Sequence, residues 1–135
     1  MPRKTCLTLA PALLLLACAT ATLEVPPPEL DGTWVLQTID GDTLPRVMTT
    51  QITIVADTLI IVADGAFSQR SYPKANILPL GVDGSAYVRG DSLFLIENVL
   101  GSIAAKGPVS HDSLFLRSLA SHQFPGHDWV YVHAH

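Results

Sequence analysis

Cys18 is the residue whose surroundings point most clearly to chemistry. The 135-residue chain has two cysteines, and Cys18 directly follows Leu15-Leu16-Ala17. Two basic residues near the start, a short apolar run and a boundary of small residues together describe an export signal. The apolar run of about ten residues is half the length of a membrane-spanning helix. We therefore expect residues 1–17 to be a cleaved signal peptide that leaves the thiol at the new chain start.

The segment Leu15-Leu16-Ala17-Cys18 resembles the bacterial lipobox at all four positions. The resemblance implies that the Cys18 thiol receives a diacylglyceryl group, that the chain is cleaved before it, and that the new amino group is usually acylated. Two or three acyl chains anchor a protein stably in a membrane. Ala19 replaces the Asp associated with inner-membrane retention, so we expect the periplasmic face of the outer membrane. The alternative is an ordinary secretory signal with a coincidental cysteine.

A second candidate for chemistry is Ser92. Gly90-Asp91-Ser92-Leu93 spells the signature of the GDSL esterases, in which the serine is the nucleophile. The Asp-x-x-His of those enzymes is missing, and a serine needs a base within hydrogen-bond distance to become nucleophilic. A similar segment recurs at residues 111–114, and Asp and Ser commonly complete turns. We interpret both segments as turns and expect no enzyme activity.

The histidines could in principle bind a metal, because imidazole suits zinc, copper and nickel. No carboxylate or cysteine lies at a familiar ligand spacing from them, so surface histidines are the simpler interpretation. We therefore predict neither a metal site nor a cofactor. The five histidines all lie late in the chain: His111, His122, His127, His133 and His135.

The composition indicates a folded, acidic domain. The chain has 8 Lys and Arg against 12 Asp and Glu, without a basic cluster, which argues against nucleic acid as a partner. Hydrophobic residues make up 48% and charged residues 15%, so the exported part is not a disordered chain. Cys6 lies in the expected signal peptide, so the exported part has no disulfide and depends on its core.

The remaining chain divides into a tether and one β domain. Residues 18–30 contain three consecutive prolines and predict a lipidated, Pro-rich tether. In residues 31–135, short apolar or alternating runs are separated by turn residues such as Asp64-Gly65. This pattern predicts an all-β fold, an antiparallel up-and-down meander of about eight strands in a small barrel, with a β-sandwich as the alternative. The expected strands are 32–39, 51–56, 59–62, 66–72, 85–88, 93–96, 103–109, 114–116 and 129–132.

A degenerate Asp-Ser/Thr-Leu repeat supports the meander. We interpret each copy as a turn that leads into a strand, and we expect Leu-Phe-Leu of the last two copies to enter the core. In the first strand we expect Trp34, Leu36 and Thr38 to share one face. The copies of the repeat begin at Asp42, Asp57, Asp91 and Asp112.

The domain resembles a group of small bacterial lipocalin-like lipoproteins. The resemblance rests on GTWVLQTIDGDTLP from residue 32, the hairpin sequence VADGAFSQ, the two DSLFL strands and the aromatic last strand. It implies that Trp34 packs at the closed base of the barrel and that Arg117 covers it through a cation–π contact. It also implies a small hydrophobic ligand, whose binding residues the sequence does not identify.

These observations predict a membrane-anchored envelope lipoprotein with a lipocalin-like domain that holds a small hydrophobic ligand. The alternative is a non-catalytic structural or protein-interaction module of the envelope with a filled barrel. The interior distinguishes the two hypotheses. An open apolar cavity would favour ligand binding, and a solid core beneath an exposed apolar patch would favour contact with an envelope protein.

Overall fold

The structure, a computed structural model, describes residues 22–75 and 77–135, so the expected signal peptide and Cys18 lie outside the described residues. The fold is an antiparallel, closed eight-stranded β-barrel, as predicted, and the β-sandwich alternative is wrong. The strands of the barrel are β1 (Gly32–Ile39), β4 (Thr53–Ile61), β5 (Ala66–Pro73), β6 (Leu80–Arg89), β7 (Ser92–Glu97), β8 (Ile103–Pro108), β9 (Ser113–Ser118) and β10 (Asp128–His133).

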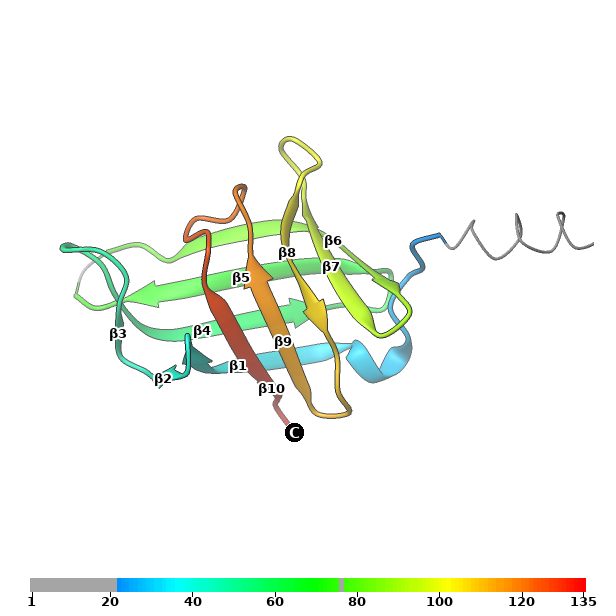
Figure 1. Ribbon diagram of the computed structural model, residues 1–135, viewed down its shortest axis with the longest axis horizontal. Helices are drawn as coiled ribbons and strands as arrows, with labels where there is room; N and C mark the ends of the chain where they lie inside the picture. Colours follow the sequence, from blue (N-terminus) through cyan, green and yellow to red (C-terminus); the bar gives the residue numbers. More distant parts are fainter. Residues whose placement is uncertain (1–21, 76) are drawn as a thin grey trace, which may run out of the picture.

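The barrel closes because β1 pairs with strands on both sides. Trp34 of β1 lies opposite His133 of β10 in one ladder and opposite Leu59 of β4 in the other. From β4 to β10, each strand pairs with the next one in the sequence, which gives the up-and-down order seen in Figure 1. Two short strands, β2 (Asp42–Thr43) and β3 (Arg46–Val47), extend the sheet beside β1 and β4. Closure pairs the edges of the sheet with each other.

The predicted turn at Asp64-Gly65 is confirmed as the connection between β4 and β5. Gly65 has a φ of +90°, a conformation that side chains other than glycine rarely adopt. The Asp64 carboxylate accepts a hydrogen bond of 3.0 Å from the backbone N–H of Ala66. The turn dipeptide therefore fixes where β4 ends and where β5 begins.

The two strands expected at residues 51–56 and 59–62 form one strand, β4. The sequence suggested a turn at Asp57-Thr58, because both residue types favour turns. In the structure Asp57 instead pairs with Ser71 in the middle of the ladder with β5, and its side chain is buried inside the barrel. Contacts with distant strands override the local preference here.

Two expected face assignments are also wrong. In β1, Trp34 and Leu36 are buried as expected, but an irregularity in the pairing before Thr38 turns Ile39 into the core instead. In the two Leu-Phe-Leu segments only the leucines are buried. Phe94 and Phe115 occupy the alternate positions of their strands and face outward.

One end of the barrel is closed by residues that precede β1. Glu24 exchanges two backbone hydrogen bonds with Val88 of β6, at 2.8 and 2.7 Å. Pro26 is buried, and the short 3-10 helix η1 (Pro28–Leu30) places Leu30 in the core with 4% of its surface exposed. Residues 24–30, which were expected to belong to the tether, thus pack against the barrel. No helix in the described ranges has the length and apolar character needed to cross a membrane.

The loop of residues 119–127, between β9 and β10, closes the opposite end. His122 and Phe124 are buried, and their rings lie 5.0 and 6.4 Å from the ring of Trp129. The Ser118 hydroxyl donates to the carbonyl of Phe124 at 2.7 Å and accepts from the backbone N–H of His127 at 2.9 Å. These hydrogen bonds fix the loop over the core.

Candidate functional site

The interior of the barrel is filled with side chains. A hollow lined by these interior side chains measures about 10 Å³, which is about the size needed for one water molecule. An eight-stranded barrel encloses either packed side chains or one small ligand, and this barrel takes the first form. The lining side chains come from β5 to β10 and the loop of residues 119–127, and include Phe67, Leu95, Leu116, His122 and Trp129.

A polar cluster lies within this core, centred on Asp57, which is 1% exposed. Tyr131 of β10 donates a hydrogen bond of 2.7 Å to one carboxylate oxygen of Asp57. Gln69 Nε2 and Ser71 Oγ, both from β5, donate to the other oxygen. Burial raises the pKa of Asp57 to about 7, although the hydrogen bonds from Ser71, Tyr131 and Gln69 each act to lower it.

Gln123 connects this cluster to the loop that closes the barrel. Its side-chain nitrogen donates to Gln69 Oε1 at 2.9 Å and to Ser71 Oγ at 3.4 Å. Burial and the neighbouring Asp57 carboxylate raise the pKa of the Tyr131 hydroxyl well above its usual value. The cluster therefore links β4, β5, β10 and the loop of residues 119–127 through buried hydrogen bonds.

A buried histidine lies at the same end of the barrel. His122 is 8% exposed, and its Nδ1 accepts a hydrogen bond of 2.9 Å from the backbone N–H of Phe124. Burial lowers the pKa of His122 to about 4, and the charge of His127 contributes to the lowering. His122 is therefore neutral at physiological pH.

Sequence reasoning did not identify Asp57 as a site residue. The Asp-Thr-Leu repeat indicated a turn at this position, whereas β4 continues through it. The signal that could have revealed Asp57 is the alternation along β4, where Asp57, Leu59 and Ile61 all point inward.

Trp34 and Arg117, the two residues expected at the barrel base, lie far apart on the barrel. Trp34 is fully buried, donates from Nε1 to the carbonyl of Leu30 at 3.0 Å, and packs against His133 with ring centroids 4.5 Å apart. Arg117 points outward and forms an ion pair of 3.1 Å with Asp128. The predicted Trp34–Arg117 contact is therefore wrong, because β9 places Arg117 opposite Asp128, at the other end of β10 from His133.

Ser92 and the histidines do not form a common site among the described residues. Ser92 begins β7, and none of the hydrogen bonds among the described residues joins it to a histidine. His127 Nδ1 lies 2.6 Å from Asp40 Oδ2 at the exposed end of β1. Within residues 22–75 and 77–135, no three His, Cys, Asp or Glu side chains gather as a metal site would require.

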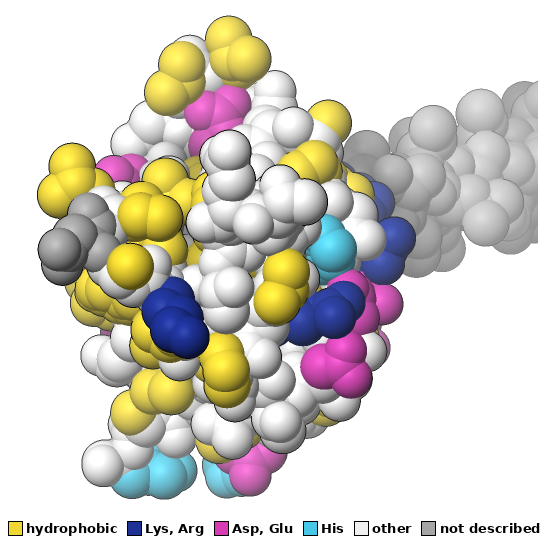
Figure 2. Space-filling model, turned by 90° about the vertical axis from the view of Figure 1, so that its left-hand side faces the viewer, with side chains coloured by type: hydrophobic (Ala, Val, Ile, Leu, Met, Phe, Trp, Pro, Cys, Tyr) yellow, Lys and Arg dark blue, Asp and Glu magenta, His cyan; other side chains and the backbone are white. Residues whose placement is uncertain are grey.

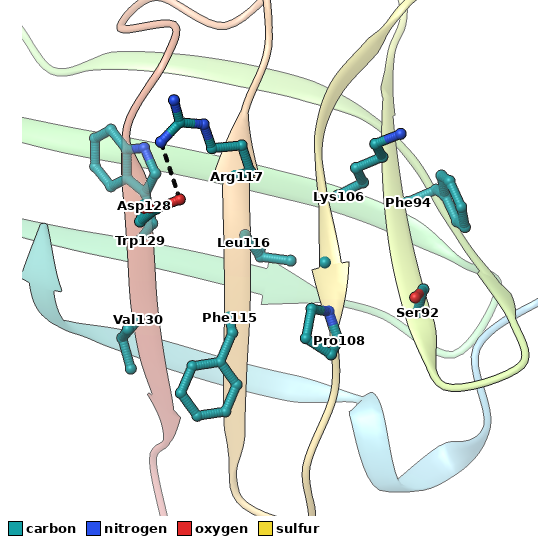
Figure 3. A pocket seen from close by; sticks show the side chains of 11 residues that line it. Ser92, Phe94, Lys106, Pro108, Phe115, Leu116, Arg117, Asp128, Trp129 and Val130 are labelled. Carbon is teal, nitrogen blue, oxygen red and sulfur yellow. Dashed lines mark ion pairs between the residues drawn. The ribbon is translucent and has the colours of Figure 1, made fainter. Parts of the chain in front are cut away.

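A hollow of about 580 Å³ lies on the outside of the barrel, over β7 to β10 (Figure 3). We call it the outer groove. The strand registers arrange its side chains in two rows that cross the four strands. One row contains three charged side chains and the other is largely apolar. The rows are Phe94, Lys106, Arg117 and Asp128, and Ser92, Pro108, Phe115 and Val130.

Small residues lie beneath this surface, on the inner side of β8. The inner face of β8 carries Ala105 and Gly107, whereas β7 and β9 carry leucines at their inner positions. A Cβ atom at Gly107 would overlap the carbonyl oxygen of Phe115, so the backbones of β8 and β9 approach too closely for a side chain. Phe94 and Phe115 lie on either side of β8 and flank the groove (Figure 3).

The outer groove offers an apolar floor beside a free cation. Phe115 is 46% exposed, although it is a large aromatic residue. Arg117 is engaged by Asp128, while Lys106 has no ion pair with any described residue. Such a surface can bind another molecule through apolar contact.

No protein-family model, curated protein or solved structure was found to match this chain.

Proposed function

We propose that the chain is a lipid-anchored lipoprotein of the cell envelope, in which a filled, non-catalytic barrel makes its contacts through its outer surface. The observation that carries this proposal is the contrast between two volumes. The hollow inside the barrel measures about 10 Å³, whereas the outer groove measures about 580 Å³. The buried Asp57 cluster supports it, because its hydrogen bonds occupy the space that a ligand inside the barrel would need.

The proposed anchor is the acylated Cys18, on the evidence of the lipobox at residues 15–18. Ala19 favours the periplasmic face of the outer membrane. The partners are accordingly the membrane, through the lipid, and an envelope protein on the outer groove. Storage of a small hydrophobic ligand inside the barrel is a weaker proposal, because the loop of residues 119–127 and its Gln123 hydrogen bonds would have to move first.

Radiolabelling with palmitate tests the anchor. The full chain, expressed with its own signal in a bacterium with two membranes, is expected to incorporate the label and to sediment with the outer membrane. The Cys18→Ser variant is expected to lose the label, because the hydroxyl is a far weaker nucleophile than the thiol. Cys6→Ser, which alters the other cysteine, is the matched control and should remain labelled. Label retained in Cys18→Ser would contradict the proposed anchor.

Native mass spectrometry tests the filled barrel. The chain of residues 18–135 carrying Cys18→Ser, exported behind an ordinary secretory signal and purified from the periplasm without denaturation, is expected to show the mass of the protein alone. A small molecule that accompanies the folded protein and leaves on unfolding would contradict a filled interior and would favour the ligand-binding alternative. Hydrogen exchange at Trp129 and Tyr131 in the presence of added fatty acid provides the second readout and is expected to remain unchanged.

A further inference from the structure

The loop of residues 119–127 carries a histidine into the core at one end of the barrel. In Figure 1 this loop joins the upper ends of β9 and β10, away from the first described residues. Figure 2 views the molecule from the left-hand side of Figure 1, and most of the surface seen there consists of hydrophobic and other uncharged side chains. His122 is buried beneath this surface, with its ring centroid 5.0 Å from that of Trp129. The His122 ring is therefore part of the packing that closes this end.

The hydrogen bond of His122 fixes where its ring can take up a second proton. Nδ1 accepts from the backbone N–H of Phe124 at 2.9 Å, so the proton of the neutral ring lies on Nε2. A second proton can enter only at Nδ1, where it would point at the N–H group that now donates to it. Protonated His122 is therefore incompatible with the closed arrangement of the loop at Phe124.

The barrel interior does not compensate a positive charge on His122. The side chains that line the hollow beside it are neutral, such as Gln69 and Leu116, apart from the titratable hydroxyl of Tyr131. Tyr131 donates its hydrogen bond to Asp57, so the Asp57 carboxylate is already engaged. A protonated His122 would thus be buried without an anionic partner of its own, which is costly in a core.

The charged groups on the outer flank of the loop are also engaged. Ser121 lines a surface hollow together with Asp83 and Glu97. Asp83 forms an ion pair of 2.8 Å with Arg70, and Glu97 accepts backbone hydrogen bonds from its own turn. His127, in the same loop, acts against a positive charge on His122.

The closed loop leaves three buried polar atoms without hydrogen-bond partners among the described residues. Opening of the loop would let each of them bond to water, so it would relieve a cost of the closed arrangement. This relief brings the open and closed arrangements closer in free energy. The three atoms are Ser121 Oγ, Gln123 Oε1 and Trp129 Nε1.

The two ends of the loop are attached more firmly than its middle. The backbone N–H of Leu119 donates to the carbonyl of Ala104 at 2.8 Å. His127 Nδ1 lies 2.6 Å from Asp40 Oδ2, and a proton on His127 strengthens this contact. Gly126, with a φ of +82°, lies directly before that attachment and can serve as a hinge. The segment that can move is therefore residues 120–125.

We propose that residues 120–125 form an acid-released lid, in which protonation of His122 at Nδ1 breaks its hydrogen bond with Phe124 and the segment leaves the end of the barrel. The strands stay folded, because opening removes the contacts of Gln123 and leaves Asp57 with its donors on β5 and β10. The open barrel presents Trp129 and the released Phe124 to solvent. Its surface at this end is therefore more apolar in acid than at neutral pH.

The direction of the pH response follows from the proton that the open loop binds. Burial lowers the pKa of His122 to about 4 in the closed loop, whereas an exposed ring has its ordinary value of 6.5. Below pH 6.5 the open loop therefore binds a proton that the closed loop does not. The ratio of open to closed loops is expected to rise about tenfold for each unit of pH between 6.5 and 4, or about 300-fold in all.

Amide hydrogen exchange measured by NMR tests the lid on the chain of residues 18–135 carrying Cys18→Ser. The protection of the Phe124 N–H, corrected for the intrinsic exchange rate at each pH, is expected to fall about 300-fold from pH 6.5 to pH 4. The indole N–H of Trp129 is expected to lose protection over the same range. The Val88 N–H, which donates to the Glu24 carbonyl at 2.7 Å, and the indole N–H of Trp34 are the internal controls at the other end and should keep their protection.

The His122→Asn variant separates the histidine from other effects of acid. Asparagine keeps an acceptor for the Phe124 N–H and does not titrate, so we expect the protection of that N–H to stay level from pH 6.5 to pH 4. His111→Asn, at an exposed histidine in the turn between β8 and β9, is the matched control and should behave as the wild type does.

Three results would overturn the inference. The first is a wild-type Phe124 protection that does not change with pH. The second is an equal loss of protection at Val88, which would indicate unfolding of the whole barrel. The third is a His122→Asn variant that still loses protection in acid. The palmitate and native-mass experiments do not depend on the lid, so the proposed function is tested separately.

Discussion

As the pH rises from 4 to 6.5, the unfolding free energy of the Asp57→Asn variant is expected to increase by about 3 kcal/mol. Over the same range, the unfolding free energy of the wild-type barrel is expected to stay nearly constant. The reason is that Asp57 and His122 are both buried and respond to pH in opposite directions. Without the Asp57 carboxyl group, the change of stability with pH over this range comes from His122 alone.

The signs follow from the proton binding of the folded and unfolded states. The pKa of Asp57 is raised from 3.8 to about 7 in the folded barrel, so its stabilisation is fully present below pH 3.8 and is lost as the pH rises through 7. The pKa of His122 is lowered from 6.5 to about 4, so its stabilisation is present above pH 6.5 and is lost as the pH falls through 4. Between pH 4 and 6.5 the two contributions nearly cancel.

Urea unfolding at a series of pH values measures this effect. His122→Asn, which keeps a hydrogen-bond acceptor for the backbone N–H of Phe124, is the opposite control and is expected to lose stability as the pH rises. The carboxyl groups of Asp40, Asp83 and Glu97 have lowered pKa values, so their contributions change at and below the acidic end of this window. A level profile in Asp57→Asn would show that the carboxyl group is not the source of the compensation.

Replacing Trp34 by Ala is expected to destabilise the barrel by about 3–5 kcal/mol, the usual range for a large aromatic residue removed from a core. Trp34 is fully buried, and it joins the barrel base to both Leu30 and His133. Trp34→Phe retains most of the buried surface and removes the hydrogen bond to the Leu30 carbonyl, so we expect it to lose about 1 kcal/mol through that bond, in addition to any repacking.

Denaturant unfolding measures both variants, and amide hydrogen exchange at Val88 shows whether residues 24–30 stay attached. Both variants are expected to exchange the Val88 amide faster than the wild type, because its hydrogen-bond partner is the Glu24 carbonyl. Phe67→Ala, at a buried aromatic residue of β5, is the matched control and should destabilise the protein without a selective effect at Val88. Equal exchange in all three variants would contradict the link between Trp34 and the segment before β1.

The sequence was sufficient to predict the barrel, because alternation and turn dipeptides act over short distances. The turn at Asp64-Gly65 lies where expected, and the expected first strand coincides with β1. The same local preferences gave a wrong prediction at Asp57. An Asp-Thr pair favours a turn unless hydrogen-bond donors from distant strands stabilise the buried carboxylate. The hydroxyl of Tyr131 is 74 residues away from Asp57 in the sequence, and no local pattern predicts that contact.

The outer groove could not be predicted for a different reason. Leu-Phe-Leu contains three apolar residues, and the hydrophobic pattern alone does not decide whether the leucines or the phenylalanine face the core. The ladder of β9 with β10 decides it, by turning Leu116 inward and leaving Phe115 outside. The close approach of β8 and β9 at Gly107 likewise depends on packing between strands, which the sequence does not express.

The docking of residues 24–30 on the barrel has a consequence for how the domain would be oriented at a membrane. If Cys18 carries lipid, at most residues 19–23 separate the acyl chains from the first backbone hydrogen bonds of the barrel, those of Glu24. Such a short linker spans about 20 Å even when fully extended. It limits tumbling and keeps the same end of every barrel turned toward the bilayer. The opposite end of the barrel, closed by the loop of residues 119–127, would then face away from the bilayer.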